Sequence, residues 1–268
     1  MKLSSAIVGE QAGPLEHPVD ARWVMAYSAA LGELNPHAVP HPLFPVCYEW
    51  PVSRSMRELP ALEPIAGLLV HAQHELIVHR PLKAGETVQC AVRIVSARQR
   101  SPGAFIVFRF ETCDARGAPL TTSDFGALYR GVQLDRDAGE PVKDPAPTTL
   151  ALHAIDEVQV AATAAHVYTE CARIWNPIHT DVAYARAAGL PDIILHGTAT
   201  LAYSISSLIR EWKLDPRAVR RVACRFSGMV LMPATLSVRA ARSGGAIQFE
   251  TLTGKGDAVI TRGALLLE

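Results

Sequence analysis

The residues most able to carry out chemistry lie in one block of the chain, between Tyr168 and Ala202. The block contains two histidines, His179 and His196, and the second is followed directly by Gly197. A histidine gains and loses a proton near neutral pH, so it is a common general acid or base. Gly197 either donates its backbone N–H to a ligand or permits a helix and a strand to pack closely. The block therefore predicts a proton-exchanging site.

Two helices and a tight turn are expected to position these residues. Apolar residues recur at helical spacing between 197 and 212, and an earlier helical stretch covers 161–173. Between them, Asn176-Pro177 favours a tight turn. A short helix is expected after Asp181, which suits an N-cap, and Gly189 suits its end.

The block belongs to the second of two similar halves. The Tyr-to-Asn-Pro spacing that begins at Tyr168 also begins at Tyr27, 141 residues earlier. Three further matches follow in the same order, GETV with PATL, FET with FET and GAL with GAL. In the first half, helices are expected over 19–31 and 44–59. Four landmarks in one order indicate a duplicated unit of about 130 residues.

Alternating sequences in both halves predict antiparallel strands. In the first half these are 73–79, 87–97, 105–112 and 120–130, and in the second 234–241, 246–253 and 258–267. A long antiparallel sheet around one apolar helix in each half is an α+β architecture. Residues 133–149 have the composition of a linker, with three prolines and alternating charges. The predicted domains are therefore 1–132 and 150–268, joined by 133–149.

The block resembles the MaoC-like family, the (R)-specific enoyl-CoA hydratases and dehydratases of the hydratase 2 type. The matching residues are Tyr168, Asn176-Pro177-Ile178-His179, Asp181, Ala187 and His196-Gly197. The first half matches the pattern less fully, through Tyr27, Asn35-Pro36 and His41-Pro42. The resemblance implies a double hotdog fold, in which each half wraps a sheet around a central helix, with a degenerate first half.

The resemblance also implies reversible addition of water to a trans-2-enoyl thioester. In this reading His179 is the acid–base residue and the N–H of Gly197 receives the thioester oxygen, on which negative charge develops. Coenzyme A is expected as part of the substrate, with no other cofactor and no metal. The residues expected to contact substrate are Tyr168, Ile174, Trp175, Asn176, His196 and Arg225.

One residue departs from the family pattern. The family aspartate two residues before the Asn is replaced by Ile174, which cannot exchange a proton. Losing one member of an acid–base pair typically slows a reaction by about 10²–10⁴-fold. The first half has Glu33 at the equivalent place. Two alternatives therefore stand beside the hydratase: an inactive acyl-CoA-binding or partner subunit of the same fold, and a hotdog thioesterase.

Composition excludes other classes of protein. The 268 residues carry 26 basic and 26 acidic groups, split evenly between the halves, which argues against binding nucleic acid. Nothing resembles a secretory signal or a membrane span, and five scattered cysteines indicate a reducing cytoplasm. The charged fraction of 19% is low, so a homodimer or higher homo-oligomer is expected.

Three histidines invite a zinc hypothesis. His71, His74 and His79 lie within one predicted strand. Side chains alternate along a strand, so His74 is expected to point away from the other two, which argues against a metal site. The basic stretch 210–225 is expected either to face solvent or to form a rim for the coenzyme A phosphates.

Overall fold

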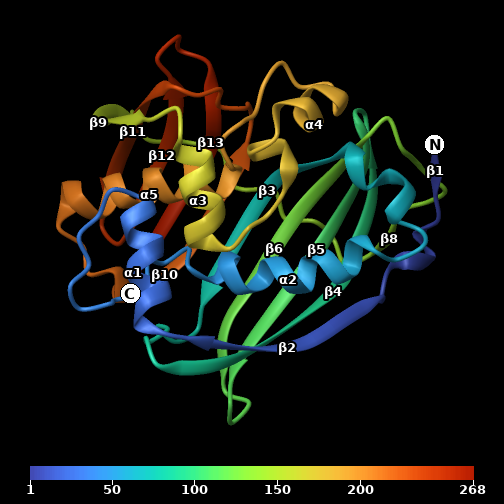
Figure 1. Ribbon diagram of the computed structural model, residues 1–268, viewed down its shortest axis with the longest axis horizontal. Helices are drawn as coiled ribbons and strands as arrows, with labels where there is room; N and C mark the ends of the chain where they lie inside the picture. Colours follow the sequence, from blue (N-terminus) through green and yellow to red (C-terminus); the bar gives the residue numbers. More distant parts are fainter. The chain divides into compact units, whose positions relative to one another are not determined.

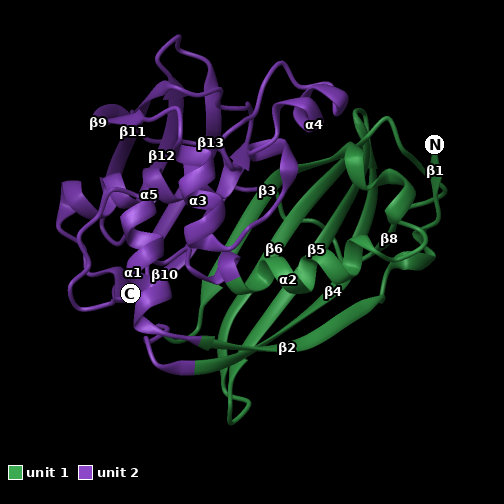
Figure 2. Cartoon of the chain, in the orientation of Figure 1, with its two compact units in different colours: residues 1–18, 48–80, 87–144 green, residues 19–47, 81–86, 145–268 purple.

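The computed structural model describes residues 1–268, which form two compact units (Figure 2). Unit 1 comprises residues 1–18, 48–80 and 87–144, and unit 2 comprises 19–47, 81–86 and 145–268. Unit 2 therefore contains the whole second half together with a helical segment of the first. The boundaries predicted at 132 and 150 stay a prediction about the repeats, because the compact units follow packing rather than sequence order.

Unit 1 contains a sheet in the order β2-β4-β5-β6-β3 (Figure 1). The pairs β4–β5, β5–β6 and β3–β6 are antiparallel. The four strands expected in this half are confirmed, and each is somewhat longer than its alternating pattern. The bounds are β2 Gln11–Val19, β3 Leu69–Val78, β4 Glu86–Arg100, β5 Gly103–Asp114 and β6 Pro119–Arg130.

Unit 2 contains a sheet in the order β10-β13-β12-β11-β9, with every neighbouring pair antiparallel. The three strands expected in this half are confirmed. Two more strands were not predicted, and one of them, β10, lies inside the basic stretch. Its valines and cysteine are buried while its arginines are half-buried. The bounds are β9 His153–Val160, β10 Val219–Phe226, β11 Ala234–Ser243, β12 Ala246–Thr253 and β13 Ala258–Leu267.

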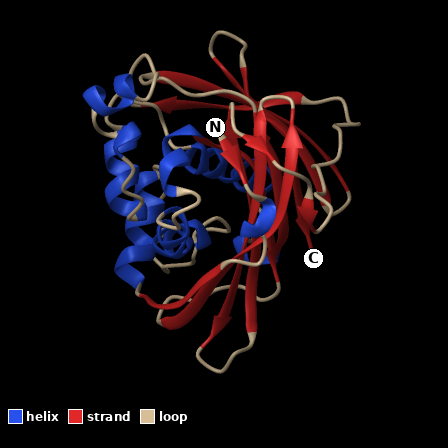
Figure 3. Cartoon of the chain, turned by 90° about the vertical axis from the view of Figure 1, so that its right-hand side faces the viewer, coloured by secondary structure: helices blue, strands red, loops and turns tan.

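The central helix of unit 2 is α5, Gly197–Trp212, with the predicted bounds. Leu201, Ile205 and Leu208 are fully buried on it, as their spacing predicts. Polar residues of the helix are bonded as well, since Ser204 Oγ lies 2.7 Å from Thr251 Oγ1 of β12. The helix thus lies against its sheet through both apolar packing and hydrogen bonds. Figure 3 shows the helices in blue and the strands in red.

Helices from both halves of the chain pack together in unit 2. The helix α1, Ala21–Ala30, lies beside α3, Ala164–Ala172. The Trp23 indole N–H donates to the Cys171 carbonyl at 3.1 Å, and the Tyr203 hydroxyl of α5 donates to the Ala30 carbonyl at 3.1 Å. The short helix α4, Val182–Ala187, follows its predicted N-cap Asp181 and ends before Gly189, which has a φ of 81°.

The helix α2, Pro45–Arg57, is the counterpart of α5 in the first half. Its Tyr48 and Glu49 side chains meet Thr121 and Ser123 of β6, so its buried face lies on the sheet of unit 1. Short 3-10 helices complete the chain at Ser5–Ile7, Glu63–Leu68, Pro177–His179 and Pro216–Ala218.

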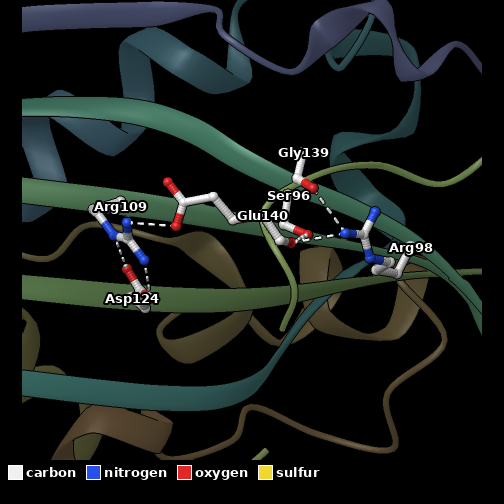
Figure 4. Close-up of polar contacts among 6 residues, drawn as sticks. All are labelled: Ser96, Arg98, Arg109, Asp124, Gly139 and Glu140. Atoms are coloured by element: carbon white, nitrogen blue, oxygen red, sulfur yellow. Dashed lines mark hydrogen bonds and ion pairs between the residues drawn. The ribbon is translucent and has the colours of Figure 1, made fainter. Parts of the chain in front are cut away.

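The first part of the predicted linker is held firmly on unit 1 (Figure 4). The short strand β7, Gln133–Leu134, pairs with β1, Lys2–Leu3. The short strand β8, Ala138–Gly139, pairs with β4. The Arg98 guanidinium donates to the carbonyls of Ala138, Gly139 and Glu140 at 2.6–2.9 Å. The Glu140 carboxylate accepts a hydrogen bond from the Arg109 guanidinium, which also donates two hydrogen bonds to the Asp124 carboxylate. Residues 135–137 and 140–149 of the predicted linker lack regular secondary structure.

The expected alternation of the strand histidines is wrong. A bulge in β3 between His71 and Gln73 interrupts the alternation. The rings of His71 and His74 therefore lie together, with centroids 5.4 Å apart in an edge-to-face arrangement. His79 lies beyond the strand, with its Nε2 atom 2.9 Å from Thr122 Oγ1.

Candidate active site

The turn after α3 brings the predicted site residues toward the start of α5. Arg173 ends α3 in the left-handed region, with a φ of 59°. The Ile174 N–H then donates back to the Thr169 carbonyl at 3.0 Å. Asn176 caps the following 3-10 turn by accepting from the Ile178 N–H at 3.4 Å. The Asn-Pro pair thus acts as the turn-forming element that the sequence predicts.

His179 is buried and its ring is oriented by one short hydrogen bond. Its Nδ1 atom lies 2.7 Å from the carbonyl oxygen of Ile194, and the residue is 8% exposed. A carbonyl only accepts, so the proton of the neutral ring is on Nδ1 and the lone pair is on Nε2. This tautomer is the one that a general base acting through Nε2 requires.

The ring of His196 stacks on that of His179. The two centroids are 3.6 Å apart and the planes differ by 23°. Burial first, and then neighbouring His179, hold the pKa of His196 well below its ordinary value, and the hydrogen bond to the Ile174 carbonyl only partly opposes them. His196 Nε2 is 3.4 Å from that carbonyl and therefore carries the proton. His196 is thus a neutral wall of the site.

Gly197 opens the first turn of α5, directly after His196. The N–H groups of a first helical turn have no acceptor within the helix, and the helix dipole favours negative charge there. A Cβ atom at residue 197 would lie 3.3 Å from two ring carbons of Phe226. Gly197 therefore permits close packing against β10, and it also presents an N–H where an oxyanion would be stabilised.

Two tyrosines from different halves meet beside this helix start. Tyr168 is fully buried, and its hydroxyl lies 3.3 Å from that of Tyr27. The Tyr168 hydroxyl also donates to Thr198 Oγ1 at 3.3 Å, and the ring centroid is 5.0 Å from that of His196. Burial raises the pKa of Tyr168, so this residue is a neutral hydrogen-bonding support for the start of α5.

The acidic residue kept by the first half does not reach His179. Glu33 Oε1 accepts from the Arg210 guanidinium at 3.2 Å. Arg210 lies in the last turn of α5, fourteen residues after His196, which corresponds to about 21 Å of helix. Since the His179 ring stacks on His196, the carboxylate and the imidazole lie toward opposite ends of α5.

The other predicted contact residues have different environments. Ile174 is buried at the turn beside His196. Trp175 is 55% exposed, so it faces solvent and does not narrow a pocket around His179. Arg225 lies on β10 next to Phe226, and adjacent strand side chains point to opposite faces. The structure therefore groups Tyr168, Ile174, His179, His196 and Gly197, and leaves Trp175 outside this group.

Sequence reasoning missed two contributors to this group. The Ile194 carbonyl sets the His179 tautomer, and backbone partners leave no side-chain signal. Tyr27 joins through its hydroxyl, and the shared Tyr-to-Asn-Pro spacing of the repeats was the available clue.

Three arginines of the basic stretch 210–225 are paired with carboxylates. Arg210 forms ion pairs with Asp156 and Glu33, Arg217 with Asp215, and Arg220 with Glu268.

No group of three or more His, Cys, Asp or Glu side chains is arranged to hold a metal ion. None of the helices combines the length and apolar character that spanning a bilayer requires.

Family comparisons cover most of the chain. Residues 139–263 match the family described as MaoC like domain, and residues 6–123 match the FAS1-like dehydratase domain region. A Drosophila melanogaster peroxisomal multifunctional enzyme type 2 is 28% identical over 70% of this chain and 32% of its own length. An Arabidopsis thaliana peroxisomal enoyl-CoA hydratase 2 is 25% identical over 67% and 62%. The chain thus spans less than two thirds of the length of each of these relatives.

Solved structures agree on the fold. A MaoC-like dehydratase from Phytophthora capsici aligns with a TM-score of 0.85 at 18% identity, over 98% of this chain and 96% of that one. A Mycobacterium tuberculosis protein described as having a double hotdog fold aligns with a TM-score of 0.63 at 13% identity, over 97% and 95%. The predicted double hotdog is therefore confirmed.

Proposed function

We propose that this chain, a double hotdog protein with a MaoC-like domain in its second half and a FAS1-like dehydratase region in its first, is an acyl-thioester hydratase or dehydratase. The observation that carries the proposal is the arrangement at the start of α5. There His179 is held in one tautomer by the Ile194 carbonyl and stacked on His196, next to the first N–H groups of the helix.

The arrangement suits addition of water to a trans-2-enoyl thioester. Nε2 of His179 accepts a proton from water as the water oxygen bonds to C3 of the substrate. Electrons move to the thioester oxygen, where the Gly197 N–H and the helix dipole stabilise the developing charge. The protonated His179 then returns the proton to C2, and the reverse sequence eliminates water. The buried, neutral His196 adds no competing positive charge.

The proposed reaction uses coenzyme A only as part of the acyl thioester, and it needs no metal or further cofactor. Relatives named as enoyl-CoA hydratases support a thioester substrate.

We also propose that the protein is a cytoplasmic homo-oligomer. The low charged fraction and the exposed side chains of Trp175, Tyr184 and Met229 support it. Light scattering during size exclusion measures the mass in solution, and a 28.9 kDa particle at all concentrations contradicts it.

The direct test is an assay of trans-2-enoyl-CoA hydration and of 3-hydroxyacyl-CoA dehydration. His179→Ala is expected to lower kcat/KM by about 10²–10⁴-fold, because the only placed proton-exchanging group is removed. His166→Ala is the matched control, since His166 is an exposed histidine on α3. Equal rates for wild type and His179→Ala overturn the proposed role.

A second candidate function is a thioester-binding subunit of the same fold that does not turn over substrate. The observation favouring it is the buried Ile174, which places a hydrocarbon where the family has a carboxylate. Wild-type protein that binds an enoyl-CoA in calorimetry, without hydrating it, supports this candidate over the enzyme. Release of free thiol from acyl-CoA instead identifies a thioesterase.

A further inference from the structure

The first two residues of α5 are open, although most of the helix is buried. Gly197 and Thr198 are half-buried, whereas every residue from Ala199 to Leu208 is buried. Apart from the last turn of the helix, a ligand can therefore touch α5 only at its start. Thr198 supplies the one polar side chain there, next to the Gly197 N–H that the proposed reaction uses.

The Thr198 hydroxyl is used differently from three other hydroxyl groups of α5. Those of Thr200, Ser204 and Ser207 each donate to the carbonyl oxygen four residues earlier, at 2.9–3.2 Å. Bonding back to that carbonyl is a common use of a hydroxyl within a helix. For Thr198 the carbonyl belongs to Ile194, which precedes the helix and already accepts another hydrogen bond. The one hydrogen bond of Thr198 Oγ1 is a bond that it accepts, so its own proton is not used within the protein.

Two tyrosine hydroxyls in series determine the direction of that accepted bond. Tyr168 donates to Thr198 Oγ1 at 3.3 Å, and its hydroxyl also lies 3.3 Å from that of Tyr27. A neutral hydroxyl has a single proton, so the bond between the two tyrosines is donated by Tyr27. Both tyrosines are fully buried, and burial raises the pKa of each, so both keep their protons. The series therefore runs from Tyr27 through Tyr168 to Thr198, and it leaves the Thr198 proton available to a ligand.

The same contacts place Thr198 beside the two stacked histidines. The Tyr168 ring centroid lies 5.0 Å from that of His196, which in turn stacks on His179 at 3.6 Å. Thr198 follows Gly197 directly, so its hydroxyl and the Gly197 N–H belong to the same first turn. A hydroxyl that accepts a hydrogen bond is a stronger donor, because each bond in a series polarises the next. The start of α5 thus holds two donors of different kinds next to the proton-exchanging histidine.

We propose that the Thr198 hydroxyl is a second donor to the thioester oxygen, beside the Gly197 N–H; this assignment rests on the proposed function. As the water oxygen bonds to C3, electrons move to the thioester oxygen, which has lone pairs for more than one donor. The two donors stabilise the negative charge there, and neither gives up its proton. Tyr27 and Tyr168 are positioning residues, since they act through Thr198. The first repeat thereby contributes Tyr27 to a site whose other groups come from the second.

Steady-state kinetics of enoyl-CoA hydration test the donor. Thr198→Val keeps the shape of the side chain and removes its hydroxyl. It is expected to lower kcat by about 10–10²-fold with little change in KM, because a hydrogen bond to a developing charge is lost. Thr198→Ser keeps a hydroxyl and should retain most of the rate. Thr163→Val is the matched control, since Thr163 is exposed at the start of α3 and its side chain caps no N–H group.

A double variant separates the series of hydroxyls from general packing. Tyr27→Phe removes one hydroxyl and keeps the ring, and it is expected to lower kcat by about two- to fivefold, because it weakens Thr198 only through Tyr168. In the Thr198→Val background Tyr27→Phe should have no further effect on kcat, since the donor that it polarises is gone. No loss in the wild-type background, or the same loss in both backgrounds, overturns the positioning role.

A spectroscopic measurement distinguishes failure of this inference from failure of the proposed function. The conjugated thioester of trans-cinnamoyl-CoA absorbs at longer wavelength when its oxygen accepts hydrogen bonds, so bound cinnamoyl-CoA reports the donors without turnover. The shift seen with wild type should be smaller with Thr198→Val and restored with Thr198→Ser. Wild type that shows the shift but hydrates no enoyl-CoA contradicts the enzyme and supports the donor, and wild type that neither binds nor hydrates overturns both. In an active wild type, a kcat or a spectral shift equal to that of Thr198→Val overturns the donor alone.

Discussion

Both repeats have a histidine before the central helix, but the surroundings of the two histidines differ. In the second repeat His196 precedes Gly197, its Nδ1 atom has no partner, and the N–H groups of the first turn lie beside His179. In the first repeat His41 precedes Pro42, which has no N–H to donate. His41 uses both ring nitrogens, accepting from the Leu43 N–H and contacting Ser206 Oγ. Burial lowers its pKa to about 3.

This difference shows how one copy of a duplicated unit can keep a site while the other becomes structural. In the first repeat His41 is buried and both of its ring nitrogens have partners, whereas the second repeat keeps N–H groups available at the start of α5. The first repeat in turn carries a buried carboxyl group on α2, Glu49, where α5 has the hydrogen-bonded Ser204. Each of the following changes breaks or sharpens this comparison.

Giving the second repeat an acid at the family position is expected to produce the largest gain in activity. Ile174→Asp should raise the hydration rate by about 10²-fold or more, because a carboxylate beside His179 shares the proton transfer. Ile174→Asn is the control, since it has a similar polarity without a titratable proton. Steady-state kinetics on an enoyl-CoA measure the effect. An aspartate variant no faster than the asparagine variant contradicts the assignment of this position.

Making the second helix start resemble the first should nearly abolish catalysis. Gly197→Pro removes the N–H, and loss of one oxyanion donor typically lowers kcat by about 10²–10³-fold. Proline is tolerated at the first position of a helix, so the fold should remain. Gly197→Ala keeps the N–H and adds the same crowding against Phe226, 3.3 Å away. Equal losses in the two variants would show that packing, and not the N–H, is what Gly197 supplies.

The buried acid of α2 should make stability depend on pH. Glu49 lies eight residues after His41, as Ser204 lies eight after His196, and burial raises the pKa of Glu49 to about 7 although Ser123 opposes it. The folded state then holds a proton that the unfolded state releases from pH 4.5 upward. Stability should fall by about 3 kcal/mol as the pH rises from 4.5 to 7, and then level off.

The Glu49→Gln variant should lose that pH dependence, because its amide does not ionise. Denaturant unfolding at several pH values measures the change, with Glu58→Gln as control, since Glu58 is exposed. A wild-type slope that persists in Glu49→Gln would assign the pH dependence to another group.

Removing the acid retained by the first repeat should have the smallest effect. Glu33→Gln is expected to lower stability by no more than about 1 kcal/mol, because its partner Arg210 is half exposed and keeps Asp156 at 2.6 Å. Turnover should be unchanged, since Glu33 lies toward the far end of α5 from His179. A variant that folds normally and loses turnover would instead place Glu33 in the reaction.

Much of the fold could be predicted from the chain because it depends on local patterns. The bounds of α5, β12 and β13 follow from apolar periodicity and turn residues within each segment. The strands β9 and β10 escaped because charged residues interrupt their apolar pattern, and burial of only some of their side chains defines them.

By itself the sequence determined that the protein is a duplication, that each copy wraps a sheet around a helix, and that one copy keeps the histidine motif. These are properties of residue types at fixed spacing. Only the tertiary structure decided that His179 stacks on His196, that Glu33 is bound by Arg210, and that a bulge joins His74 to His71. The reason is physical: such contacts depend on backbone geometry and on partners far away in the chain, which spacing along the sequence does not encode.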